Sequence, residues 1–455
     1  MSRSLTVGLH VFGQMQVNEV SSSTGTRSTS REAGLDVARV VAMAFVVLEH
    51  ACVATMLFPM QRLLWPVQDP PVSGVKGENI GWYWVDALFH LVRGLGVPIV
   101  TVAAGFVAMR ALERKGVNAF LHERRRRLGG ALLLGVAVIL PVMYFIWAWG
   151  WTLRGWASWG NVADVRFGPA VQPNLYGLGH LWYLEYLLLY SLIAAVLWKT
   201  MFAKVPQSVA RILVRPVERV ALALGVLAPV LTLWPSCVVS FHNGFIPEPG
   251  QFIKYFLFFV WGMMLARCVE RGESSGVQSG RTIRCVHHAT RWWVADLLLA
   301  GVGAWMLLVG MTHLHDNVWP EPPRWPRLPF LPDVEGFSWQ RYEVMAGAAL
   351  LSVCGCFGVV GLCERVAAWS GARVRWLAQA SMTVYLTHLI PVGISCVLWY
   401  KVDVPAGVKI GSGFVAGIGA PLLVRWVVML VTKRVKEKKA RGSPLSGIKA
   451  SSTRN

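Results

Sequence analysis

Charged residues are scarce in this chain of 455 residues. Only 15% are Asp, Glu, Lys or Arg, whereas 55% are hydrophobic, and the mean hydropathy is +0.48. Soluble globular domains contain about 25% charged residues, so this composition excludes an ordinary soluble domain. Acids are the rarer sign, and the net charge is +20. The basic residues lie between apolar stretches and not on a soluble face, so we expect no nucleic-acid partner.

Features that mark several other classes of protein are also missing. The eight cysteines lie mostly in or beside apolar stretches without framework spacing, so we expect neither a disulfide scaffold nor a zinc site. The stretch His313-Leu-His315-Asp316 lacks a third strong ligand and is interpreted as a solvated loop, so no metal is expected. No internal repeat is visible, which weakens the case for a transporter built from duplicated halves.

The apolar residues form about ten stretches of roughly twenty residues, the length that crosses a bilayer core. They lie near 37–58, 87–108, 128–149, 181–202, 219–238, 252–270, 292–312, 343–363, 376–399 and 410–431. The weakest is 219–238, which Pro229 and Pro235 interrupt. We predict an all-α polytopic membrane protein with a transmembrane domain at 33–431. A disordered leader, 1–32, and a basic disordered tail, 432–455, are expected to flank it.

Basic residues indicate which side of the membrane each connection faces. Most of the Lys and Arg lie in 109–127, 203–218, 271–291, 364–375 and the tail. By the positive-inside rule these segments are cytoplasmic, and both termini are expected on that side. The leader contains no long apolar run, so no signal peptide is expected. We therefore expect a multi-pass protein of the inner (plasma) membrane, with the lipid bilayer as its partner.

The first apolar stretch carries ionisable residues that lipid does not tolerate without a reason. Asp36 and Arg39 lie at one end, and Glu49 and His50 lie deep inside. A charge at the bilayer centre costs about 2.5–3.5 kcal/mol even on the lenient insertion scale, so such groups normally face a polar cavity. Arg39 and His50 are eleven residues apart, which is about three helical turns or roughly 16 Å, and they share one face. Asp36 is expected to pair with Arg39.

This spacing resembles that of the acyltransferase family 3 integral-membrane proteins. Their first helix carries a basic residue, ten further residues and a histidine, which correspond to Arg39 and His50 here. Further segments resemble the family in the same order. They are HLVRGLGVPIVTVAAGF (90–106), FLHERRRRLGGALLLGVAVILP (120–141), HLWYLEYLLLYSL (180–192), FIKYFLFFVWGMMLAR (252–267) and SMTVYLTHLIPV (381–392). The resemblance covers roughly residues 33–430.

One branch of the family is the most similar. The His-Leu-Trp-Tyr-Leu form of the fourth helix is similar to the glucan biosynthesis protein C group, which succinylates periplasmic glucans. Ala104 replaces the usual serine of a Ser-Gly-Phe turn, and Leu187 occupies the place of a glutamate found in the broader family. Glu185 lies roughly 200° around the helix from Leu187, so it does not inherit that role. These departures favour the glucan-modifying branch.

The resemblance implies a membrane-bound O-acyltransferase. It would move an acetyl- or succinyl-class group from cytoplasmic acyl-CoA to a hydroxyl of an extracytoplasmic glycan, with no bound cofactor. Such transfer needs a base or a nucleophile, and an imidazole with an unperturbed pKa near 6.5 can be either. His50 is therefore the expected catalytic residue, with Arg39 positioning the donor and an orienting group from another helix. The alternatives are a buried structural histidine and, for the whole chain, a secondary transporter or exporter of a small anionic or sugar-like solute.

Other polar residues inside the spans are candidates for substrate binding. Those expected on the acceptor side are Arg93, His90, Glu185, Trp182, Tyr385 and His388. Arg124 and Arg127 belong to an arginine run that is expected to hold the phosphates of acyl-CoA, since guanidinium groups match phosphate geometry. Interfacial anchoring, helix–helix hydrogen bonds and positive-inside topology are the alternatives for these residues.

Overall fold

The structure is a computed structural model, and it describes residues 33–57, 64–69, 84–164, 177–198, 200, 215–239, 241, 243–270, 290–314, 338–367 and 371–441. Within these ranges the chain contains helices and no strand, so the all-α prediction is confirmed. The helices in chain order are α2 (Ala33–Cys52), η1 (Val53–Thr55), α3 (Trp84–Arg124), η2 (Arg125–Gly129), α4 (Gly130–Leu134), η3 (Gly135–Ile139), α5 (Leu140–Leu153), α6 (Trp159–Ala163), η5 (Gly179–Leu181), α7 (Trp182–Leu197), α9 (Pro216–Leu222), η7 (Ala223–Leu227), α10 (Ala228–Leu233), α11 (Ser236–Val239), α12 (Pro249–Glu270), α14 (Trp293–Leu314), α15 (Trp339–Val366), α16 (Ala372–Thr387), α17 (Leu389–Leu398) and α18 (Ala406–Arg441).

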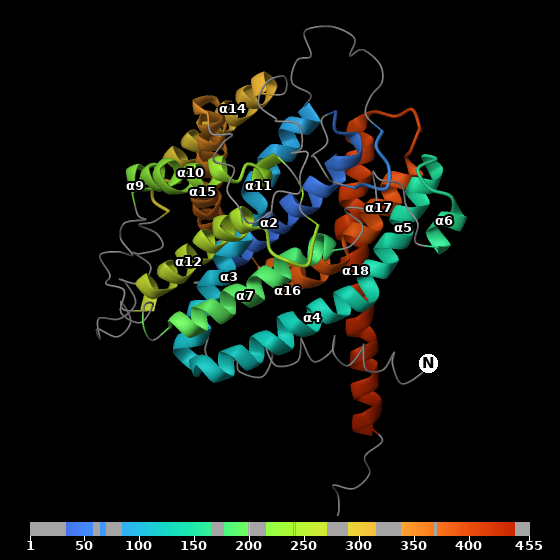
Figure 1. Cartoon of the computed structure of the whole chain (residues 1–455). Helices are drawn as coiled ribbons and strands as arrows, with labels where there is room; N and C mark the ends of the chain where they lie inside the picture. The colour runs from blue at the N-terminus through green and yellow to red at the C-terminus, as the bar shows by residue number, and fades with distance from the viewer. Residues whose placement is uncertain are drawn as a thin grey trace, which may run out of the picture.

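The chain is a multi-pass membrane protein. In the described residues seven helical runs are long and apolar enough to cross a bilayer, and the bent pair α16 and α17 makes an eighth. The run Trp84–Leu153 contains two of the predicted spans. It turns at Gly116, whose φ of 75° suits a residue without a Cβ, and α4 and α5 then lead away from α3 (Figure 1). The predicted span 252–270 is helical as α12.

Helix α2, which carries Arg39 and His50, lies in the middle of the bundle. It packs against α3, α15, α16 and α18, and Figure 1 shows it enclosed by them. Its small residues Ala38 and Ala42 are fully buried, which allows the neighbouring helices to approach closely. The polar face of α2 therefore points into protein and not into lipid.

Glycines set the closest helix crossings. A Cβ on Gly105 of α3 would overlap the carbonyl of Phe259 in α12, and a Cβ on Gly262 would overlap the carbonyl of Val102. Gly303 of α14 and Gly347 of α15 face one another in a similar way, since a Cβ on Gly303 would lie 2.7 Å from the Gly347 oxygen. Such small-residue contacts bring backbones together where lipid provides no hydrophobic driving force.

Large apolar side chains cover the outside of the bundle. Leu298 and Trp305 on α14 are 68% and 65% exposed, and Val415 on α18 is 68% exposed. In water such faces would be aggregation-prone, but in a bilayer they contact acyl chains. Helix α15, in contrast, is almost wholly buried within the bundle.

Prolines account for two breaks. The predicted span 219–238 is helical to Leu233, and then Trp234 leaves the helical region because the residue before a proline disfavours it. Helices α16 and α17 meet at His388 with a bend of 58°. Pro391 has no N–H to give the carbonyl of Thr387, and its ring crowds that carbonyl, so a straight helix cannot continue.

The structure describes part of the tail expected at 432–455 and none of the leader expected at 1–32. Helix α18 continues to Arg441, beyond the boundary expected at 431, because its Lys- and Arg-rich end retains good helix formers (Figure 1). Residues 1–32, 315–337 and 442–455 lie outside the described residues. Of the loop expected at 313–316, His313 and Leu314 belong to the last turn of α14, and the other two residues are not described.

Candidate active site

Three of the described histidines meet beside the bend of α16 and α17. His50 comes from α2, His180 from η5, and His388 stands at the bend itself. The His388 ring lies between the other two, with centroid distances of 5.0 Å to His50 and 5.5 Å to His180. The His388 Nε2 and His50 Nδ1 atoms are 3.3 Å apart.

Backbone carbonyls contact one nitrogen of each imidazole. His50 Nδ1 is 2.7 Å from the Val46 oxygen, and His180 Nε2 is 3.1 Å from the Leu386 oxygen. His388 Nδ1 is 3.0 Å from the oxygen of Val384 and 2.9 Å from that of Tyr385. The end of α16 thus supplies carbonyl acceptors to both His180 and His388, and the Val384 oxygen also accepts the backbone N–H of His388.

These contacts decide where each neutral ring keeps its proton. A carbonyl can only accept, so the facing nitrogen must donate its N–H, and the other ring nitrogen then keeps a lone pair. His388 Nε2 is therefore an acceptor, and it shares the N–H of His50 Nδ1 with the Val46 oxygen. His50 Nε2 keeps its lone pair, and no described residue hydrogen-bonds to it. A nitrogen in this state can take up a proton or attack an electrophile.

Two cavities meet at His50. The larger, of about 350 Å³, has arginines at one end, then a stretch with apolar walls that include Val100, Ala103 and Leu187, and His50 with His180 at the other end. Its arginines come from α2, the α3–η2 run and α18. Those at the far end are Arg39, Arg124, Arg127 and Arg425, and a fifth, Arg93 of α3, lines the cavity near His50.

The smaller cavity, of about 60 Å³, has mainly aromatic walls. They are formed by Trp65, Phe89, Tyr144, Trp147 and Trp151, together with residues shared with the larger cavity. The Trp65 ring stacks on the His50 imidazole, with a centroid distance of 6.0 Å and an interplanar angle of 15°. Of the described residues, those lining both cavities are Glu49, His50, Arg93, His180 and Phe241. His50 is thus reachable from two sides.

A buried ion pair lies beside this junction. Arg93 of α3 donates to Glu49 of α2 over 2.8 Å, and both side chains are mostly buried. The pairing lets both charges remain inside the bundle, where either one alone would be costly. Arg93 is expected on the acceptor side from the sequence, but its pairing with Glu49 could not be predicted, because the two residues lie on different helices.

Comparison with known proteins assigns the chain. The model of the acyltransferase domain of family 3 matches residues 32–430. The chain belongs to acyltransferase family 3. No curated protein and no solved structure matches it. As a family member, this acyltransferase is an enzyme that transfers acyl groups other than aminoacyl groups.

In this acyltransferase the family's basic residue and histidine line the same cavity. Arg39 donates to Ser381 Oγ over 3.2 Å and pairs with Asp36 at 3.5 Å, which confirms the predicted pair within α2. Arg39 lies at the arginine end and His50 at the junction, as their spacing on one helix face requires.

The arginine run of the acyltransferase divides into two pairs. Arg124 and Arg127 line the larger cavity, whereas Arg125 and Arg126 are exposed outside it. Arg124 also stacks over Phe120 at 5.2 Å, which fixes its direction. The positive-inside rule alone would not distinguish the four residues.

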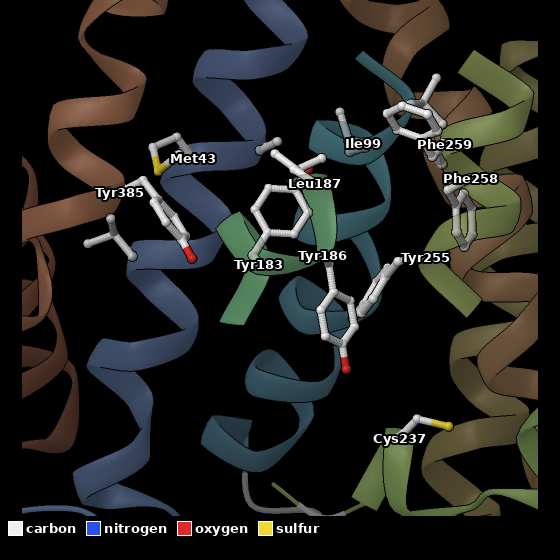
Figure 2. Close-up of a cluster of buried hydrophobic side chains, with 14 of the residues drawn as sticks. Met43, Ile99, Tyr183, Tyr186, Leu187, Cys237, Tyr255, Phe258, Phe259 and Tyr385 are labelled. Atoms are coloured by element: carbon white, nitrogen blue, oxygen red, sulfur yellow. The ribbon is translucent and has the colours of Figure 1, made fainter. Parts of the chain in front are cut away.

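The remaining predicted residues are divided by the structure. Trp182 and Tyr385 line the larger cavity, and Trp182 stacks on Tyr255. Tyr183 lies edge-on to Tyr385, with ring centroids 6.0 Å apart; Figure 2 shows both tyrosines. His388 contacts His50 directly. His90 is buried against Phe89, and Glu185 is half-buried; neither lines one of the two cavities.

Two residues near the junction were not selected from the sequence. His180 directly precedes the fourth span in the sequence, and Trp65 lies in the connection between the first and second spans. The glycines at 177 and 179 were the available indication for His180, since Gly179 has a φ of 54° and turns the chain into the bundle. The described residues contain no group of three His, Cys, Asp or Glu that could hold a metal ion.

Proposed function

We propose that the protein transfers an acetyl- or succinyl-class group from cytoplasmic acyl-CoA to a hydroxyl of an extracytoplasmic glycan. The observation that carries this proposal is the position of His50, where an arginine-lined cavity meets an aromatic one. Donor and acceptor would reach the same nitrogen from opposite directions, so neither molecule needs to cross the membrane.

The larger cavity suits the donor. Coenzyme A is polyanionic, and guanidinium groups bind phosphates through paired, charge-assisted hydrogen bonds. From Arg39 to His50 the helix rises about 16 Å, and the apolar walls between them would follow the pantetheine arm. Phosphates at the arginine end would thereby place the thioester beside His50.

The chemistry follows from the protonation state of His50. Nε2 takes the proton of the acceptor hydroxyl as the oxygen attacks the thioester carbon, the C–S bond breaks, and the departing thiolate receives the proton from the imidazolium. His388 Nε2 accepts the N–H of His50 Nδ1, which would hold the ring and stabilise its charged form. A covalent route through an acyl-imidazole would use the same nitrogen.

Aromatic walls on the far side of His50 suit a sugar, whose apolar faces pack on rings. Trp65, Trp147 and Trp151 would provide such contacts. The charge asymmetry of the connections supports an inner-membrane protein with this side outward. The His-Leu-Trp-Tyr-Leu sequence at 180–184 supports a glucan acceptor of the glucan biosynthesis protein C type.

The test combines purified protein in phospholipid vesicles with radiolabelled acetyl-CoA or succinyl-CoA and envelope glycans from cells that lack the gene. We expect covalent label in a glycan together with release of the coenzyme A thiol. Mass spectrometry of glycans from cells with and without the gene then identifies the acyl group and its acceptor. Label that crosses the vesicle membrane without entering any glycan would instead indicate a transporter.

A further inference from the structure

His180 has one ring nitrogen for which the protein offers no partner. Its Nε2–H donates to the Leu386 oxygen, and its Nδ1 is buried without a hydrogen bond from any described residue. The residue is only 4% exposed. Because Nε2 carries the proton, Nδ1 is a lone pair that requires a donor. A buried acceptor left unmatched is costly, and native proteins rarely keep one without a reason.

The position of His180 is fixed from both sides. The Tyr385 hydroxyl donates to the His180 backbone oxygen, and Asn243 Oδ1 accepts the N–H of Gly179 over 2.9 Å. These contacts fix the backbone at His180, and the hydrogen bond from Nε2 to the Leu386 oxygen orients the ring. It lines both cavities, as His50 does, so a molecule that reaches His50 Nε2 also passes His180.

We infer that His180 binds the acceptor, with Nδ1 accepting a hydrogen bond from a sugar hydroxyl next to the one that reacts. This inference rests on the proposed function. At its reacting end the donor has only the thioester carbonyl and sulfur, which offer no proton, whereas every sugar hydroxyl offers one. The reacting hydroxyl gives its single proton to His50, so the hydroxyl that meets His180 is a second one on the same acceptor.

Two substitutions separate this role from packing. H180Q keeps an N–H donor near the place of Nε2 for the Leu386 oxygen but has no acceptor near Nδ1. H180N places its Oδ1 near Nδ1 and gives up the Leu386 contact. A structural role predicts the larger defect for H180N, whereas acceptor binding predicts it for H180Q. His122, exposed on α3 and outside both cavities, provides the control H122Q.

The readout is the ratio of glycan labelling to hydrolysis of acyl-CoA by water, which does not depend on the amount of active protein. We expect H180Q to lower this ratio about 3- to 10-fold and to raise the KM for the labelled glycan fraction by a similar factor, as for the loss of one hydrogen bond. H180N should keep most of the ratio, and the KM for acyl-CoA should not change.

The outcomes distinguish the inference from the function on which it rests. Wild-type protein that labels no glycan overturns the proposed function. If the wild type labels a glycan and H180Q shows the same ratio and the same KM, the role of His180 is overturned. If H180Q raises only the KM for acyl-CoA, His180 belongs to the donor side. Ethylene glycol and ethanol test the second hydroxyl: the wild type should prefer the diol and H180Q should not, and equal preference in both proteins contradicts the inference.

Discussion

Replacing the two cavity-lining arginines with glutamine should weaken donor binding, whereas replacing their two neighbours should not. Arg124 and Arg127 line the larger cavity, and Arg125 and Arg126 are exposed outside it. Both double variants remove the same charge from the same turn of the helix. Any effect on membrane topology should therefore be equal, and a difference between the variants reports on the cavity alone.

The size of the effect can be worked from the surroundings of the two side chains. A hydrogen bond to a charged group contributes about 1.5–3 kcal/mol. The Arg127 side chain is 40% exposed and pairs with Glu123 at 3.2 Å, so the lower end of the range applies. Two contacts of about 1.5 kcal/mol give about 3 kcal/mol, which is on the order of a 100-fold rise in KM for acyl-CoA.

The assay is the initial rate of coenzyme A release at varied acyl-CoA and varied ionic strength. R124Q/R127Q should raise KM, leave kcat near the wild-type value and make KM less sensitive to salt, because screened attraction has been removed. R125Q/R126Q should resemble the wild type. If both double variants insert normally and show the same KM, the arginines serve topology and the larger cavity is not the donor site.

Three further outcomes are expected. His50→Gln should lower acyl transfer at least about 100-fold without loss of membrane insertion. Arg39→Ala should keep measurable turnover at saturating donor. Near wild-type transfer by His50→Gln would make His50 a packing residue. A reporter fused to the C-terminus should be active only in the cytoplasm and one within 313–340 only outside, and external activity of the first would remove one span. Gly262→Leu should lower the melting temperature in detergent, since the new side chain would overlap α3 at a cost of about 1–3 kcal/mol. Gly301→Leu, with open space around Gly301, should leave the melting temperature unchanged. Equal melting temperatures of the two variants would mean that α3 and α12 can move apart at little cost in stability.

Periodicity along single helices was readable from the sequence. The positions of the spans and the shared face of Arg39 and His50 depend on residues a few turns apart, and the structure agrees with them except at 219–238, where the helix ends at Leu233. The division of the arginine run was not readable, because it depends on how η2 packs against α7, a helix that lies far from it in the sequence. The local pattern of four arginines is the same for either pair.

The histidine cluster could not be predicted because it forms across long separations. His50 and His388 are 338 residues apart, and His180 and Leu386 are 206 apart. Their meeting requires the bend at His388, whose cause is a proline three residues further along. That proline was visible in the sequence, but the direction of the bend depends on α2 and α5, which pack against α17.

The bend has a consequence for how this family member can vary during evolution. Main-chain oxygens, and not carboxylates, assign the proton of each imidazole in the cluster. A carboxylate partner is lost by one substitution, whereas a carbonyl is present whatever residue stands at the position. Neighbouring side chains can therefore drift, to suit a different acyl group or sugar, without disturbing the chemistry of the cluster. The vulnerable position is Pro391, since a residue with an N–H there would let the helix straighten and move the Leu386 oxygen away from His180.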